Sequence, residues 1–103
     1  MSMKKIIDGK TYNTDTATEL GNYRKNPGDF SFVDESLYRT NKGAYFLAGK
    51  GGPMSKYAES CGLNEWCGGS DIHPISEQEA RRWLERHCEV ENYIAAFGEP
   101  EEA

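Results

Sequence analysis

The stretch FSFVDESLYRTNKGAYFLAGKGG, residues 30–52, carries the strongest β-strand signal in the chain. Its apolar and aromatic residues fall into two runs, roughly residues 32–40 and 44–48, separated by the turn sequence NKG at residues 41–43. A three-residue hairpin loop needs a left-handed backbone at its last position, which Gly43 adopts without steric cost. We therefore predict two antiparallel strands joined at this turn.

Further β signals lie on either side of this hairpin. In KKIIDGKTY, residues 4–12, the central Asp-Gly pair is a favoured two-residue turn, which predicts a first hairpin. DIHPI, residues 71–75, can add a last strand, and Pro74 confines that strand to a sheet edge because proline has no backbone N–H. Residues 49–70 contain six glycines and little periodicity, so we interpret them as one long loop of the kind that is often functional.

A short helix is expected over NTDTATELG, residues 13–21. Thr16 and Glu19 have the spacing of a capping box, in which each side chain bonds the backbone N–H of the other residue. Gly21 is a natural helix stop. The sequence therefore predicts an N-terminal helix of two or three turns.

Two amphipathic helices are expected near the C-terminus. Ser76 and Glu79 have capping-box spacing, and apolar residues then recur at helical spacing as far as His87. After a short break the same periodicity resumes over residues 90–97, and Gly98 ends it. The C-terminal segment therefore predicts a pair of helices, each with one apolar face.

Together these elements predict an α+β fold. A small, mostly antiparallel sheet consists of two hairpins and an edge strand, with the short N-terminal helix beside it and the two C-terminal helices packed on it. A chain of 103 residues buries roughly 65% of the surface that it exposes when unfolded, enough for one core. We therefore expect a single domain over residues 1–103 with a frayed acidic tail at residues 99–103.

Charge is unevenly distributed along the chain. Residues 1–70 carry nine Lys or Arg against eight Asp or Glu, whereas residues 71–103 carry three against nine, a net charge of −6. Such an acidic segment repels nucleic acid and attracts basic protein surfaces, although it also serves simply to keep a protein hydrated. Direct nucleic-acid binding is therefore not expected. The apolar runs are too short for a membrane span or a signal peptide, which favours a soluble, cytoplasmic protein.

The glycine-rich segment after the central hairpin is not a nucleotide cradle. A P-loop has a glycine, four residues and then Gly-Lys-Ser/Thr. Here five residues instead of four separate Gly43 from the pair Gly49 and Lys50. Gly51 also stands at the position where a P-loop has its Ser or Thr. We instead expect this segment to end the hairpin and to present Lys50, Lys56 and Tyr57 to solvent.

Three cysteines in a chain without a secretion signal indicate reduced thiols rather than a disulfide framework. Cys61, Cys67 and His73 have the spacing Cys-x5-Cys-x5-His, and sulfur with imidazole suits zinc, but the short spacing typical of structural zinc is missing. A zinc site is thus an alternative to ordinary buried thiols, and no cofactor is expected. His87 and Cys88 are adjacent only in sequence, with no third residue to orient them, so catalysis is not expected.

Four segments carry a family resemblance: KKIIDGKTYNTDTATELG, SLYRTNKGAYFLAGKGGPMSKYAES, GGSDIHPISEQEARRWLERH and YIAAFGE. They look like a family of small proteins carried on bacterial phages and other mobile elements. Similar short proteins from such elements include anti-CRISPR proteins, which bind an RNA-guided nuclease and block it. The resemblance covers most of the chain and contains no catalytic motif. It implies a non-enzymatic inhibitor that acts in the cytoplasm of a bacterial host cell.

The expected function is therefore binding to a CRISPR effector protein, so that DNA binding or cleavage by that effector is blocked. An acidic surface that occupies a basic, nucleic-acid-binding surface gains association rate and affinity, both of which salt weakens. The residues expected to contact the partner are the acids Glu85, Glu89 and Glu91 and the loop residues Lys50, Lys56 and Tyr57. A zinc-binding or nucleic-acid-binding regulatory protein is the alternative.

Overall fold

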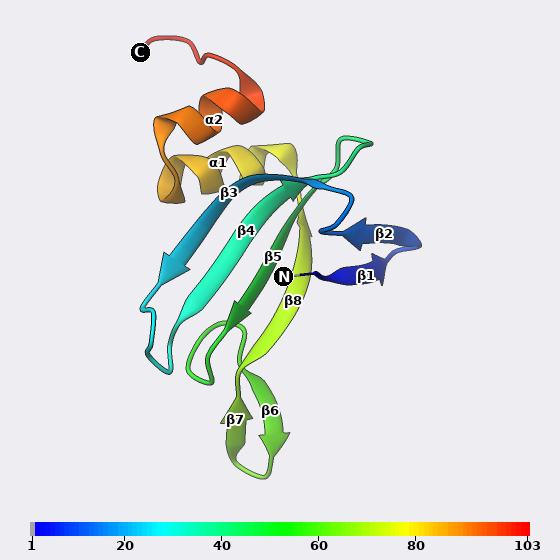
Figure 1. Cartoon of the computed structure of the whole chain (residues 1–103), viewed down its shortest axis with the longest axis vertical. Coiled ribbons are helices and arrows are strands. Elements are labelled where there is room, and N and C mark those ends of the chain that lie inside the picture. Colours follow the sequence, from blue (N-terminus) through cyan, green and yellow to red (C-terminus); the bar gives the residue numbers. More distant parts are fainter. Residues whose placement is uncertain (1) are drawn as a thin grey trace.

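Four antiparallel strands form the central sheet in the computed structural model, which describes residues 2–103 (Figure 1). Their order is β3-β4-β5-β8, so β4 and β5 lie in the middle and β3 and β8 form the edges. The strands are β3 (Thr18–Lys25), β4 (Val33–Arg39), β5 (Tyr45–Gly51) and β8 (Gly69–Ile75). The α+β class with a mostly antiparallel sheet is thus confirmed, as is the edge position of the strand that contains Pro74.

The central hairpin forms as predicted, and Gly43 has the expected left-handed backbone with φ of 86°. However, β5 continues three residues beyond the predicted end at residue 48, because β8 pairs with it along its whole length as far as Gly51. The first residues of the predicted long loop, 49–70, therefore belong to the sheet.

Two further hairpins lie outside the sheet. The N-terminal one joins β1 (Lys4–Ile7) to β2 (Lys10–Asn13) through the predicted Asp-Gly turn, whose two residues both have positive φ. The other joins β6 (Glu59–Gly62) to β7 (Glu65–Cys67) inside the segment predicted as loop, so that prediction is wrong. Its strands are exposed throughout and have no buried face, so they lack the alternation of apolar and polar residues that marks a strand.

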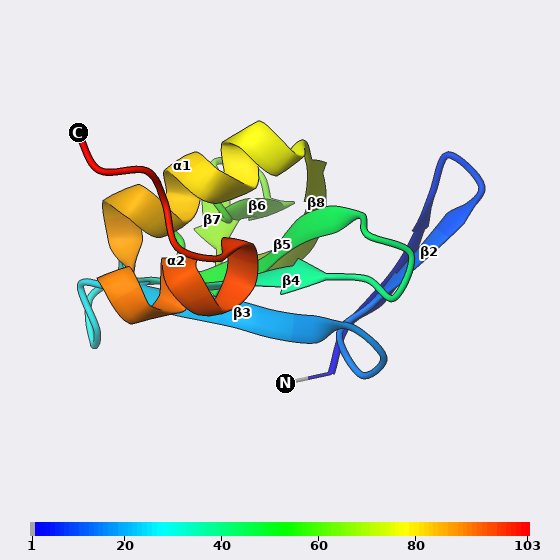
Figure 2. The same ribbon diagram turned by 90° about the horizontal axis from the view of Figure 1, so that it is seen from above.

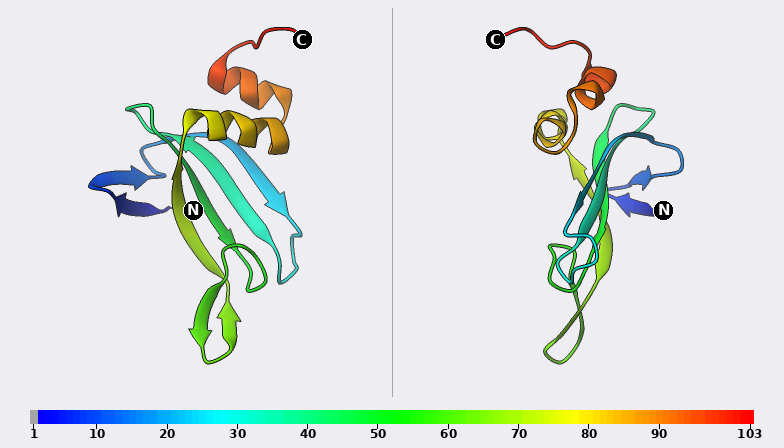
Figure 3. Two further views of the ribbon diagram at one scale, coloured as in Figure 1. Left: turned by 180° about the vertical axis from the view of Figure 1, so that it is seen from behind. Right: turned by 60° about the vertical axis from the view of Figure 1, so that its left-hand side comes forward.

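Both hairpins extend away from the sheet (Figure 3). The radius of gyration is 14.9 Å, against about 13 Å for a compact chain of this length.

The predicted N-terminal helix over residues 13–21 is wrong, because this segment enters β3 at Thr18 and pairs with β4. Gly21 does not stop a helix here. A Cβ atom at this position would lie 2.7 Å from Cys88 Sγ and 3.0 Å from Leu84 Cδ2. The missing side chain therefore lets the end of α1 approach the sheet closely. Pairing of this segment with β4 outweighs the local capping signal.

The helices α1 (Glu77–His87) and α2 (Val90–Phe97) lie on one face of the sheet (Figure 2). At the start of α1 the capping box is confirmed: the backbone N–H of Glu79 donates to Ser76 Oγ at 3.1 Å, and that of Ser76 donates to Glu79 Oε1 at 3.1 Å. Residues 2–103 thus contain two helices, both C-terminal, rather than the three predicted. In that described range, neither helix is long and apolar enough to cross a membrane.

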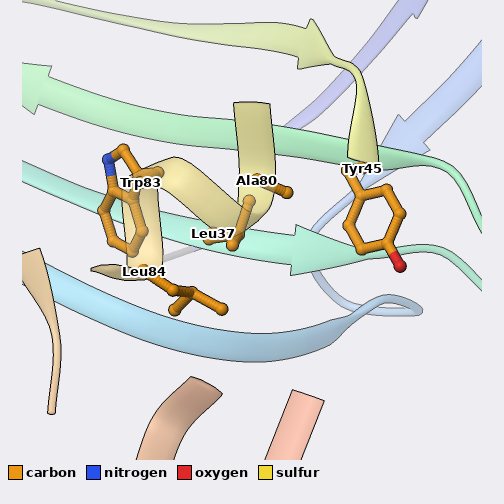
Figure 4. Close-up of a cluster of buried hydrophobic side chains, with 5 residues drawn as sticks. All are labelled: Leu37, Tyr45, Ala80, Trp83 and Leu84. Carbon is orange, nitrogen blue, oxygen red and sulfur yellow. The ribbon is translucent and has the colours of Figure 1, made fainter. Parts of the chain in front are cut away.

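The sheet has a hydrophobic core on each face, because successive residues of a strand point to opposite sides. Under the helices, a first cluster brings sheet residues together with one side of α1; its buried members are Leu37, Tyr45, Ala80, Trp83 and Leu84 (Figure 4). On the other face, the β1–β2 hairpin supplies Tyr12 to a second cluster with Phe46, Ala48 and Ile72. The helices therefore pack on one face of the sheet, and Tyr12 at the base of the first hairpin contributes to the core on the other face.

Candidate functional site

The junction between α1 and α2 brings together two of the predicted acids. Glu85 and Glu89 are both exposed, and both line a groove of about 290 Å³. Most of the remaining lining is apolar and comes from α1, α2 and the C-terminal segment, including Val90 and Ile94. We call this surface the acidic groove.

Two features make the acidic groove an unusual surface. Val90, the first residue of α2, is 69% exposed, although burial of an aliphatic side chain is favourable. Glu89 precedes it at the N-terminal end of the helix, where the helix dipole stabilises negative charge. The Asn92 side chain accepts a hydrogen bond from the Glu89 backbone N–H at 3.2 Å, which fixes the start of the helix. An exposed apolar side chain thus lies next to an acidic residue whose backbone is fixed at the start of the helix.

The other predicted contact residues lie elsewhere. Glu91 is exposed on α2 but does not line the acidic groove. Lys50 and Lys56 are exposed as expected. Lys50 lies in β5, one residue before its end, and Lys56 follows that end, which points away from the helices (Figure 1). Tyr57 is only 5% exposed, so its predicted presentation to solvent is wrong. The six predicted residues therefore do not form one surface.

The buried Tyr57 side chain donates a hydrogen bond to a buried carboxylate. Glu35, on β4, is 2% exposed. The Tyr57 hydroxyl donates to Glu35 Oε2 at 2.7 Å, the Trp83 indole N–H donates to Oε1 at 3.1 Å, and Lys56 Nζ lies 2.9 Å from Oε2. The opposite strand position is Gly49, where any Cβ atom would collide with the tyrosine ring. These contacts form a clamp, which we define as Glu35, Lys56, Tyr57 and Trp83.

The electrostatics keep this clamp in one protonation state. Burial by itself raises the pKa of Glu35, but the hydrogen bonds from Lys56, Tyr57 and Trp83 outweigh it and leave the pKa below its ordinary value. For Tyr57, burial and the hydrogen bond to Glu35 raise the pKa strongly. The carboxylate thus stays ionised and the phenol stays protonated. Since both carboxylate oxygens are engaged, the clamp joins the segment after β5 to the sheet and to α1.

Beside the clamp lies a cavity of about 280 Å³ that includes Tyr23 and His87 in its lining. The His87 ring stacks on Tyr23 with 4.0 Å between ring centroids, and burial lowers its pKa. Cys88 points to another neighbour, because its Sγ lies 3.8 Å from the carbonyl oxygen of Asn22. Burial raises the pKa of the Cys88 thiol. The two adjacent residues thus do not form a nucleophile and base pair.

The prediction of reduced thiols is wrong for Cys61 and Cys67, which form a disulfide across the β6–β7 hairpin. Strand pairing, which a cysteine count cannot reveal, brings their Cα atoms to 5.8 Å. The alternative zinc site with His73 is not formed, because a disulfide has no thiolate to offer. Among residues 2–103 no group of three His, Cys, Asp or Glu side chains could hold a metal. The cytoplasmic location, inferred partly from reduced thiols, stays a prediction.

Sequence reasoning missed Glu35, although a signal was present. Val33, Glu35 and Leu37 alternate along the predicted strand, so all three point to the same face. An acid between two inward apolar residues predicts a buried carboxylate that needs donors. The identity of those donors could not be predicted, since Trp83 comes from a helix 48 positions away.

Comparisons with known protein families, with curated proteins and with solved structures give no match to this chain.

Proposed function

We propose that this chain is a non-enzymatic protein-binding module that uses the acidic groove as its contact surface. The observation that carries this proposal is the position of Glu85 and Glu89 beside an apolar lining that includes the exposed Val90. Interfaces commonly combine an apolar centre with polar residues around it. The acidic groove has both parts.

The partner that fits this surface is a basic protein surface with an apolar side chain among its Lys and Arg residues. The apolar part gains free energy from burial, and the carboxylates select positive charge. The net charge of −6 over residues 71–103 adds long-range attraction, which speeds association and weakens as salt increases.

Inhibition of a CRISPR effector is the specific form of this function that we propose. Such effectors hold the guide and target strands in a positively charged channel. An acidic module that occupies part of this channel blocks DNA binding or cleavage without any chemistry of its own. The resemblance to small proteins of phages and mobile elements supports this assignment, and with it action in the cytoplasm of a bacterial host, without a cofactor.

The test uses purified CRISPR effector complexes, one at a time, with co-elution on a sizing column and cleavage of target DNA as the two measurements. The variant Glu85→Arg/Glu89→Arg reverses the charge of the acidic groove. Its matched control, Glu59→Arg/Glu65→Arg, makes the same change of net charge at exposed positions of the β6–β7 hairpin, away from the acidic groove. We expect stoichiometric inhibition by the natural chain and by the hairpin variant, and a loss of affinity of about tenfold or more for the groove variant.

Two results would contradict the proposal. Equal losses for the two variants would show that net charge alone attracts the partner and that the acidic groove is not the contact surface. Failure to bind any effector would remove the CRISPR assignment. In that case, retention of the chain on other purified nucleic-acid-binding proteins, with the same difference between variants, would still support an acidic protein-binding module.

A further inference from the structure

The β6–β7 hairpin is the most exposed part of the chain with regular structure. All residues of both strands are exposed, and the hairpin extends from the end of the sheet opposite the helices (Figures 1 and 3). Leu63 at its tip is 91% exposed, and Trp66 is 63% exposed. The disulfide between Cys61 and Cys67 crosses this hairpin. Since no side chain of either strand is buried, packing contributes little to its order.

We propose that Cys61 and Cys67 are a thiol–disulfide exchange site whose redox state decides whether the β6–β7 hairpin is ordered. The co-reactant is a small thiol of the glutathione class. Its thiolate attacks one sulfur, the S–S bond breaks, and a mixed disulfide forms while the other cysteine leaves as a thiolate. A second glutathione attacks the mixed disulfide, which releases glutathione disulfide. Two electrons and two protons have then passed to the cysteine pair, and excess glutathione disulfide reverses the sequence.

Exposure makes this pair suited to exchange. Both cysteines lie on exposed strands, so a thiolate can approach their sulfurs from solvent. Exposed disulfides are commonly the labile ones, whereas buried disulfides resist reduction. The third cysteine, Cys88, does not compete, because it is partly buried against the carbonyl of Asn22.

The effect of reduction on the hairpin follows from its size. A two-stranded hairpin without a packed face is at best marginally stable in water. In this hairpin the register also shifts between Ser60 and Gly62, which leaves few regular pairs. Closing the short ring between two cysteines six positions apart favours the ordered form by on the order of fiftyfold through loop entropy. Reduction of the disulfide removes this preference for the ordered hairpin.

The structural effect of reducing the disulfide is expected to be confined to the β6–β7 hairpin. The chain after the hairpin is held by the sheet, since β8 pairs with β5 from Gly69 onward. Gly68 lies close against the backbone of Gly51, where a Cβ atom would come within 2.7 Å of the carbonyl oxygen. The disulfide therefore controls how Leu63 and Trp66 are presented, at the end of the molecule away from the acidic groove, without controlling the fold.

The first experiment equilibrates the full chain in glutathione buffers of graded ratio, followed by alkylation of free thiols and mass spectrometry. The expected result is a single transition from three free thiols to one as the fraction of glutathione disulfide rises, with Cys61 and Cys67 protected together. Two results would overturn the proposal: a pair that stays oxidised in excess reduced glutathione, or one that stays reduced in excess glutathione disulfide.

The second experiment measures the hairpin itself by amide NMR in both redox states. Reduction should abolish the cross-strand contacts between β6 and β7 and lower their amide protection by up to about fiftyfold, while β4 and β5 keep theirs. Cys61→Ser should match the reduced protein under oxidising conditions. The matched control, Cys88→Ser, should keep the hairpin and its transition. An ordered hairpin in the reduced protein, or loss of the whole sheet with it, would contradict the proposal.

Discussion

Replacing Tyr57 with phenylalanine should lower the free energy of unfolding by about 1.5–3 kcal/mol, the usual contribution of a hydrogen bond to a charged group. The change removes the hydroxyl that lies 2.7 Å from Glu35 Oε2 and keeps the ring that packs over Gly49. Lys56 still reaches the carboxylate, but it is exposed and contributes less than a buried donor. In a domain of this size the melting temperature should fall by roughly 6–24 °C.

The loss of unfolding free energy in Tyr57→Phe should also depend on pH. The pKa of Glu35 in the folded protein is below its ordinary value of 4.5. Its interactions therefore contribute stability that is fully present above the unfolded pKa and is lost as the pH falls through the folded pKa. Tyr57 is one of the donors that lower this pKa. The natural protein should thus lose more stability on acidification than Tyr57→Phe, and the two unfolding free energies should converge below pH 4.5.

Urea unfolding followed by circular dichroism measures both effects. The matched control is Tyr45→Phe, since Tyr45 is also buried, at 8% exposure. None of the described residues hydrogen-bonds its hydroxyl, so this variant should lose no more than about 0.5 kcal/mol. Equal losses for the two variants near neutral pH, or a Tyr57→Phe loss that stays constant below pH 4.5, would refute the clamp as described.

Three further changes test the fold and the clamp. Gly49→Ala should lower the free energy of unfolding by about 1–3 kcal/mol, because the added methyl collides with the Tyr57 ring. Combined with Tyr57→Ala, which removes the ring, it should lower that free energy by less than the sum of the two single changes in urea unfolding; strict additivity would argue against the contact. Ser76→Ala should lower the free energy of unfolding by about 1 kcal/mol, because the backbone N–H of Glu79 loses its acceptor. An unchanged midpoint of urea unfolding would contradict the role of Ser76 as a helix cap. Leu84→Ala should lower the free energy of unfolding by about 2–5 kcal/mol, because truncation of this fully buried side chain leaves a cavity. Thermal unfolding measures this loss, and a loss below about 1 kcal/mol would contradict the position of Leu84 in the core.

The elements that could be predicted are those whose signals lie within a few residues. The Asp-Gly turn of the first hairpin, the turn at Gly43 and the capping box at Ser76 each depend on the backbone preferences of neighbouring residues. Prediction was wrong over residues 13–21, where an equally local capping signal loses to pairing with β4. Contacts with distant segments decide the outcome here, since the close packing of Leu84 and Cys88 on Gly21 requires a strand at this position.

The candidate site was predictable only in part. Charge counting identified Glu85 and Glu89, but the acidic groove between them and Val90 exists only because α2 folds back against α1. Tyr57 lies among glycine and serine residues, which predicted an exposed loop. Its burial requires Glu35, which is 22 positions away along the chain.

By itself, the sequence determined the fold class, the position of the central hairpin, the start of α1 and the acidic character of the C-terminal third. Those properties depend on local backbone energies and on composition, which no distant residue changes. Only the tertiary structure decided that residues 18–25 form an edge strand, that Cys61 and Cys67 are paired, and that Glu35 is surrounded by donors. Each of these is a contact between segments, and its free energy exists only once the sheet has brought the partners together.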